Sequence, residues 1–85
     1  MPATQSLNVE VQYFAILREQ RGLAREQLAT GAATAGELYR DLAARHALAL
    51  GPEHLRVAIN DEFSAWDAPL AEGDRIVFIP PVAGG

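Results

Sequence analysis

The sequence predicts an α+β fold in which one main helix packs on one face of a mixed sheet of about five strands. Two observations support this prediction. One long helical segment, near residues 34–48, separates strand-like segments in the two halves of the chain. The last of these segments is a continuous apolar run, which is typical of a central strand. We therefore expect a single domain over residues 7–80, between a disordered N-terminus at 1–6 and a flexible tail at 81–85.

The first half of the chain predicts a strand, a short helix and a second strand. Apolar and polar side chains alternate from residue 7 to residue 13, which is the period of a half-buried strand. Residues 15–21 are good helix formers, and Gly22 follows them as a stop signal. A second strand is expected over roughly 24–29, paired with the first.

The main helix is predicted to begin at Thr34. Thr34 and Glu37 have the spacing of a capping box, in which the hydroxyl and the carboxylate satisfy backbone amides at a helix start. Leu38 and Leu42 then fall at helical spacing and give the helix an apolar stripe. The pattern ends near residues 46–48, and the helix should lie across the sheet.

The second half of the chain predicts three more strands. Residues 55–59 form a strand that the turn formers Asn60 and Asp61 bring to an end. Residues 63–66 are short and predict an edge strand, and the apolar run at 75–79 predicts the central one. Strands, one dominant helix and a central last strand are together the arrangement of a β-grasp, or ubiquitin-like, domain.

Composition excludes several classes of function. The chain has no cysteine, so it forms neither a disulfide nor a thiolate metal site and carries no persulfide of its own. His46 and His54 stand eight residues apart without a supporting cluster, so we predict no metal site. The net charge is −4 and the seven arginines are scattered, which argues against a nucleic-acid or membrane partner. With no signal-peptide pattern at its start, we expect a cytoplasmic protein.

The last six residues change from stiff to permissive. Pro80 and Pro81 end the central strand, because proline has no amide with which to continue a ladder. Gly84 and Gly85 lack side chains and allow any backbone conformation. A frayed tail of small residues is the plain alternative. Because the glycines follow a central strand and a Pro-Pro spacer, we interpret the tail as functional, with Gly85 as the group that acts.

Several segments resemble the small, sulfur-carrier subunit family of molybdopterin synthases, within the ubiquitin-like sulfur carriers. The similarity extends from about residue 7 to residue 85, and its specific part is the Phe-x-Pro-Pro-Val-x-Gly-Gly ending. The segments that carry it are Tyr13-Phe-Ala-Ile-Leu-Arg-Glu19, Val57-Ala-Ile-Asn60, Asp67-Ala-Pro-Leu70, Glu72-Gly-Asp74 and Phe78-Ile-Pro-Pro-Val-Ala-Gly-Gly85.

The resemblance implies a chemistry at Gly85 itself. A ubiquitin-activating-like adenylyltransferase uses ATP to convert the terminal carboxylate into an acyl-adenylate, and a sulfurtransferase then supplies the sulfur that displaces AMP. The resulting thiocarboxylate donates its sulfur to cyclic pyranopterin monophosphate in the large subunit, where two carriers complete one dithiolene. The implied assembly is a heterotetramer of two small and two large subunits. This chain would bind no cofactor and contribute no catalytic side chain, only the positioned Gly84-Gly85 end.

Apolar residues outside the core predict a docking surface. Phe14 is out of phase with the apolar residues of the first strand, and Val77 and Ile79 are out of phase with Ile76 and Phe78 in the last one. They should emerge on the sheet face opposite the helix. The resemblance implies contacts at the positions of Phe14, Phe63 and Ile79, although an aromatic residue that merely covers an edge is the alternative. Arg18 matches a family arginine, and a surface ion pair is equally compatible with it. The complete expected partner-binding set is Phe14, Arg18, Phe63, Val77, Ile79, Pro80, Pro81 and Val82.

Three other functions stay open at the level of sequence. The chain could carry sulfur for thiamine thiazole or for tRNA thiolation, which keeps the mechanism and changes the acceptor. It could be a ubiquitin-like modifier whose Gly85 forms an isopeptide with a target lysine. It could also be a β-grasp binding module with an inert tail, in which case deletion of Gly84 and Gly85 would change nothing.

Overall fold

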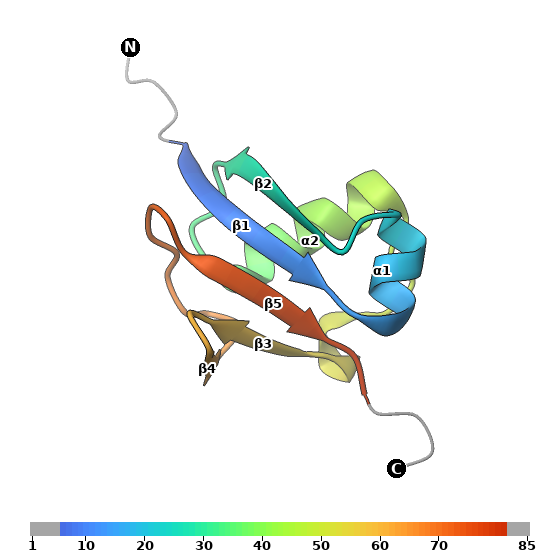
Figure 1. The fold of residues 1–85 in the computed structure, drawn as a ribbon. Coiled ribbons are helices and arrows are strands. Elements are labelled where there is room, and N and C mark those ends of the chain that lie inside the picture. Colours follow the sequence, from blue (N-terminus) through green and yellow to red (C-terminus); the bar gives the residue numbers. More distant parts are fainter. Residues whose placement is uncertain (1–5, 82–85) are drawn as a thin grey trace.

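The structure, a computed structural model, describes residues 6–81 and confirms the α+β fold with a five-stranded mixed sheet (Figure 1). The strand order is β2-β1-β5-β3-β4. In chain order the elements are β1 (Leu7–Tyr13), α1 (Ala15–Arg21), β2 (Arg25–Thr30), α2 (Ala35–His46), a 3-10 helix (Pro52–His54), β3 (Arg56–Ile59), β4 (Glu62–Ser64) and β5 (Arg75–Ile79).

β5 occupies the centre of the sheet, as the continuous apolar run predicts. It runs parallel to β1, with Tyr13 opposite Phe78, and antiparallel to β3, with Val57 opposite the same Phe78. β1 pairs antiparallel with β2 on its other side. Figure 1 shows α2 behind this sheet. We call the opposite face of the sheet, in front in Figure 1, the outer face.

α1 connects β1 to β2. Gly22 ends α1 with a φ of 83°, and its N–H donates to the carbonyl of Arg18 at 2.9 Å. This left-handed conformation is one that glycine adopts without a steric penalty. The predicted helix at 15–21 is therefore confirmed, together with its stop signal.

α2 begins where the capping box predicts. Thr34 is the N-cap residue, and its Oγ1 accepts a hydrogen bond from the Glu37 N–H at 3.2 Å. The Glu37 carboxylate accepts from the N–H of Ala33 at 3.0 Å, so it caps the residue before the one that a capping box requires. The helix ends at His46, and Ala47 follows it with a φ of 55°.

A two-residue turn joins β3 to β4. Asn60 and Asp61 have φ values of 53° and 72°, and positive φ at both central positions defines a type I′ turn. β4 is an edge strand as predicted, but it spans Glu62–Ser64 and does not reach Trp66. The chain turns towards α2 instead, because the Trp66 carbonyl accepts from the Gly36 N–H at 2.8 Å.

The core lies between α2 and the sheet and holds β5 in place. The ring centroids of Tyr39 and Phe78 are 5.0 Å apart in an edge-on arrangement, and Trp66 stacks on Phe78 at 6.0 Å. Aromatic pairs at such distances contribute roughly 0.5–1.5 kcal/mol beyond the burial of their area. Trp66 is partly buried, whereas Tyr39 and Phe78 are no more than 1% exposed. The same low exposure is shared by Val11, Tyr13, Leu17, Ala35, Leu38, Val57 and Ile76.

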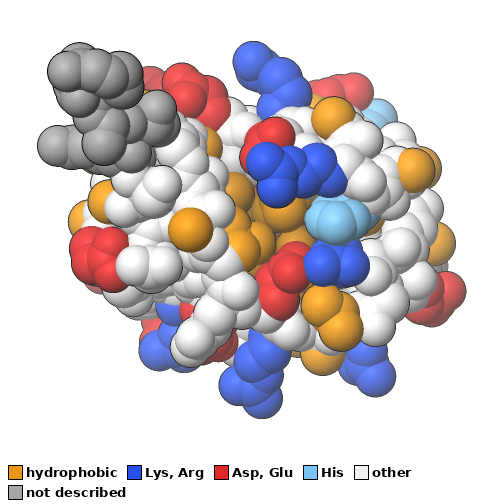
Figure 2. Space-filling model, turned by 90° about the horizontal axis from the view of Figure 1, so that it is seen from above, with side chains coloured by type: hydrophobic (Ala, Val, Ile, Leu, Met, Phe, Trp, Pro, Cys, Tyr) orange, Lys and Arg blue, Asp and Glu red, His pale blue; other side chains and the backbone are white. Residues whose placement is uncertain are grey.

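The charges on the surface are mixed in the view of Figure 2. Seen from the β2 side of Figure 1, acidic and basic side chains are interspersed around a hollow with hydrophobic side chains at its centre. On this side of the molecule, no sign of charge gathers into a broad patch. Among residues 6–81, no helix has the length and apolar character needed to cross a membrane.

Candidate functional site

The functional candidate with the clearest structural basis is the outer face, together with the point where β5 ends. Gln12, Val77, Ala58 and Phe63 stand directly opposite one another across β1, β5, β3 and β4. Side chains opposite one another in neighbouring strands project to the same face. Because Phe78, the next residue along β5, belongs to the core, this row belongs to the outer face.

Four of the seven apolar residues expected to bind a partner meet at one shallow hollow, which we call the outer hollow. Phe14, Phe63, Val77 and Ile79 all line its volume of about 280 Å³. Phe14 is 47% exposed and Phe63 is 67% exposed, so both remain available to a partner. Val77 differs from the expectation of an emerging side chain. It is only 7% exposed, because the longer side chains around it shield this central strand, and it forms the floor of the hollow.

Phe14 owes its position to the start of α1. It is the N-cap residue, with an extended backbone, and its carbonyl accepts the N–H of Leu17 at 3.1 Å. The next residue, Ala15, has a φ of 53°, a left-handed value that costs a residue with a side chain roughly 1–2 kcal/mol. Phe14 therefore stays on the outer face that Gln12, two residues before it, also occupies, and the turn after it brings Leu17 into the core.

A second hollow, the exit hollow, surrounds the end of β5. Its volume is about 320 Å³, and it lies between β3, β4 and the residues that follow β5. Pro80 is buried, whereas Pro81 is exposed, so the chain passes from the domain to its surface at this step. The lining residues are His54, Leu55, Arg56, Phe63, Ile79, Pro80 and Pro81.

Arg56 is a site residue that the sequence analysis did not single out. Its guanidinium carbon lies 5.6 Å from the centroid of the Phe63 ring. The period-2 pattern of β3 could have placed Arg56 on the outer face, because it stands two residues before Ala58 and shares its face. Arg18, in contrast, is exposed on α1 and lines neither the outer hollow nor the exit hollow. Its expected contact with a partner stays a prediction.

A cluster of titratable groups with shifted pKa values lies on the helix side of the sheet. The Tyr13 hydroxyl donates to Glu26 Oε2 at 2.7 Å, and Arg21 donates to both carboxylate oxygens. Hydrogen bonds from Arg21 hold the pKa of Glu26 below its ordinary value, and burial raises the pKa of Tyr13. These groups satisfy one another and tie β1, α1 and β2 together, so we assign them a structural role. No pattern in the sequence indicated this cluster.

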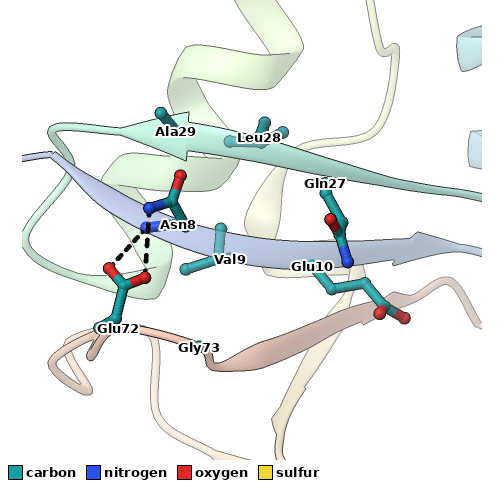
Figure 3. Close-up of a pocket in the computed structure, with 8 residues that line it drawn as sticks. All are labelled: Asn8, Val9, Glu10, Gln27, Leu28, Ala29, Glu72 and Gly73. Carbon is teal, nitrogen blue, oxygen red and sulfur yellow. Dashed lines mark hydrogen bonds between the residues drawn. The ribbon is translucent and has the colours of Figure 1, made fainter.

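A larger hollow of about 410 Å³ lies at the opposite end of the sheet (Figure 3). Glu72 accepts hydrogen bonds from the backbone N–H of Asn8 at 2.9 Å and from its side-chain amide at 3.2 Å. The Gly73 N–H donates to the Asn8 carbonyl at 2.7 Å. The Glu72 carboxylate therefore already holds the turn before β5 against the start of β1. We interpret this hollow as structural, remote from Pro80 and Pro81.

Three of the expected site residues, Val82, Gly84 and Gly85, lie outside the described residues, and their roles stay predictions. Within residues 6–81, no group of three or more His, Asp or Glu side chains is arranged to hold a metal ion. What the described part offers is a surface: an apolar outer hollow that is continuous, through Phe63 and Ile79, with the exit hollow.

Comparisons with known proteins cover almost the whole chain. A model of the ThiS family matches residues 11–85. The molybdopterin synthase sulfur carrier subunit of Escherichia coli (strain K12) is 38% identical in an alignment of 80 positions, which covers 91% of this chain and 99% of the relative.

Solved structures agree with the sequence matches. A protein-protein complex of subunits 1 and 2 of the molybdopterin-converting factor from Helicobacter pylori contains a chain with a TM-score of 0.63 and 30% identity, covering 93% of this chain and 100% of that one. SAMP1 from Haloferax volcanii gives a TM-score of 0.74 at 30% identity, covering 92% of this chain and 99% of its own.

Proposed function

We propose, because this chain belongs to the ThiS family, that it is the sulfur carrier subunit of a molybdopterin synthase and that Gly85 carries the sulfur. The proposal rests above all on the position of β5. This central strand ends at Ile79 and leads through Pro80-Pro81 directly to the Gly84-Gly85 end, within the range that the family model matches. The rigid core fixes where the tail starts, and two glycines leave its end narrow.

The proposed chemistry takes place on the terminal carboxylate, which is a poor electrophile until it is activated. A ubiquitin-activating-like enzyme transfers AMP from ATP to the carboxylate, and pyrophosphate leaves. Sulfur from a sulfurtransferase, brought to the oxidation level of sulfide by a thiol reductant, then displaces AMP and leaves a thiocarboxylate on Gly85. In the large subunit this sulfur is the nucleophile that attacks the pterin precursor, cyclic pyranopterin monophosphate. Water then hydrolyses the bond between the sulfur and the Gly85 carbonyl, which returns the carboxylate, and two carriers supply the two sulfurs of the dithiolene.

The described residues contribute position and recognition to this scheme. The outer hollow is the surface that we propose for docking onto the large subunit, because it has exposed aromatic side chains and shares Phe63 and Ile79 with the exit hollow. The complex of subunits 1 and 2 from Helicobacter pylori supports a large-subunit partner. We further propose a tetramer of two small and two large subunits, located in the cytoplasm.

Intact-mass spectrometry tests the sulfur carrier directly. The purified chain is incubated with ATP, the activating enzyme and a sulfur donor, alongside a variant that lacks Gly85 and the variant Ala83→Ser, which keeps the terminal Gly84-Gly85. We expect a gain of about 16 Da, one oxygen replaced by sulfur, in the wild type and in Ala83→Ser but not in the deletion.

Other outcomes of the same experiment would point elsewhere. Covalent adducts with other proteins would identify a modifier, and an unchanged mass with a competent enzyme would identify an inert tail. If the thiocarboxylate forms, adding the large subunit and the pterin precursor decides the acceptor. Sulfur delivered only to a thiamine precursor or to tRNA would contradict the proposal at that last step.

A further inference from the structure

Arg56 places a positive charge beside the exit of the tail. It begins β3 and stands opposite Ile79, the last residue of β5. Its guanidinium carbon is 5.6 Å from the centroid of Phe63, the most exposed of the large hydrophobic side chains that the structure describes. Stacking on an aromatic face orders an arginine side chain and leaves its charge in place.

Arg56 forms no ion pair within the described part of the chain. Arg21, Arg45 and Arg75 each form an ion pair with a carboxylate, at 2.8, 3.4 and 3.5 Å. For Arg56, no carboxylate of residues 6–81 lies within ion-pair distance. An arginine ordered by stacking, flanked by apolar groups and without an internal partner is arranged to receive a carboxylate from another molecule.

The length of the tail brings that other molecule close to Arg56. Gly85 is the fourth residue after Pro81, and a fully extended chain spans at most about 3.3–3.6 Å per residue, or about 14 Å over these four steps. A protein that takes Gly85 into its active site must therefore come within about 14 Å of Pro81, which lines the exit hollow together with Arg56. Burial under such a partner strengthens an ion pair relative to its strength in water.

We propose that Arg56 is a specificity-determining residue, which pairs with an Asp or Glu side chain of the large subunit at the rim of the channel that receives the tail. This inference rests on the proposed function and adds to it the chemistry of one contact. A carboxylate fits the planar fork of a guanidinium with two parallel hydrogen bonds. The chain as a whole carries a net charge of −4 and repels acidic surfaces, so the pair would favour one orientation of the partner.

The test is the affinity of the full chain for the purified large subunit, compared among four variants. Arg56→Glu reverses the charge, Arg56→Met removes it and keeps an apolar stem, and Arg56→Lys keeps it without the planar fork. Arg40→Glu is the matched control, because it makes the same charge change on an exposed position of α2, behind the sheet. Thermal unfolding of each variant verifies that the domain is folded.

We expect Arg56→Glu to raise the Kd at least tenfold and Arg56→Met to raise it several-fold, with Arg56→Lys between Met and the wild type. Arg40→Glu should stay within about twofold of the wild type. The difference in Kd between the wild type and Arg56→Met should shrink as the salt concentration rises from 0.05 to 0.5 M. This range brackets 0.1 M, at which the Debye length is about 10 Å.

Two results would overturn the inference while leaving the proposed function intact. One is a wild type that binds and transfers sulfur while Arg56→Glu binds no more weakly than Arg40→Glu. The other is a defect of Arg56→Glu confined to adenylation, with unchanged affinity for the large subunit. A wild type that neither binds the large subunit nor forms a thiocarboxylate would overturn the proposed function, and this inference with it.

Discussion

Arg21 and Glu26 form a two-pronged ion pair, in which Nε lies 2.9 Å from Oε2 and Nη2 lies 2.8 Å from Oε1. The side chains are only 21% and 16% exposed. With the Tyr13 hydroxyl bonded to the same carboxylate, the pair joins the end of β1 to the end of α1 and to β2. Because Phe14 stands at the other end of α1, this network also holds one wall of the outer hollow.

The first prediction is that Glu26→Gln destabilises the domain in a way that depends on pH. Hydrogen bonds from Arg21 lower the pKa of Glu26, so the folded state favours the ionised carboxylate. The contribution is present above the carboxyl pKa of the unfolded chain and is lost as pH falls through the lowered pKa of the folded state. We expect a cost of about 1–3 kcal/mol in the free energy of unfolding at pH 7.

Urea unfolding of the wild type and of Glu26→Gln, at neutral pH and at pH values below the carboxyl range, measures this difference. Glu19→Gln serves as the control, since Glu19 is exposed on α1. Glu19→Gln should change the free energy of unfolding by no more than about 0.5 kcal/mol at either pH. A Glu26→Gln penalty that is the same in acid as at neutral pH would show that the ion pair is not its cause.

The second prediction concerns the turn between β3 and β4, where Asp61→Gly should stabilise the domain. Asp61 has a φ of 72°, and glycine adopts such values without the steric cost that a Cβ brings. The substitution also removes an ion pair with Arg75, but that pair is 3.5 Å long and exposed, and such pairs contribute little. We expect a gain of about 0.5–1 kcal/mol.

Asp61→Ala provides the matched comparison in the same unfolding experiment. It removes the same ion pair but keeps a Cβ at a left-handed position, so it should lower the free energy of unfolding. If Gly and Ala at position 61 destabilised the domain equally, the ion pair with Arg75 would be the dominant effect, and the argument from φ would be wrong.

The parts of the fold that the sequence predicted are those that depend on neighbouring residues. The alternation of apolar and polar side chains predicted β1, the capping pattern at Thr34 predicted the start of α2, and Gly22 predicted the end of α1. The exceptions depend on residues far apart in the chain. Trp66 lies outside β4 because its carbonyl accepts a hydrogen bond from the Gly36 N–H on α2, a contact that no local sequence pattern predicts.

The same distinction applies to the candidate site. The period-2 pattern predicted which face Val77 occupies, but not its burial, because shielding depends on the register of β5 with its neighbours. Arg56 could be placed on a face from sequence, whereas its stacking on Phe63 requires the β3–β4 hairpin. The Tyr13–Arg21–Glu26 cluster joins three elements and needed the tertiary structure to be seen.

The third prediction is that Phe63→Ala weakens binding to the large subunit far more than it weakens the fold. Phe63 is 67% exposed and lines both the outer hollow and the exit hollow. An exposed ring contributes little to folding, and its stacking with Arg56 adds roughly 0.5–1 kcal/mol at most. Central aromatic residues of an interface commonly contribute 2 kcal/mol or more to binding, so we expect the Kd to rise by about thirtyfold.

Leu23→Ala is the control for the third prediction, because Leu23 is a large hydrophobic residue that is 41% exposed and lines neither hollow. Isothermal titration with the large subunit gives the Kd, and thermal unfolding gives the stability of each variant. Leu23→Ala should change the Kd less than twofold, because scattered exposed hydrophobic residues are ordinary on a protein surface. Equal effects of the two substitutions on the Kd would show that the outer hollow is not part of the interface. The large subunit would then recognise the tail alone.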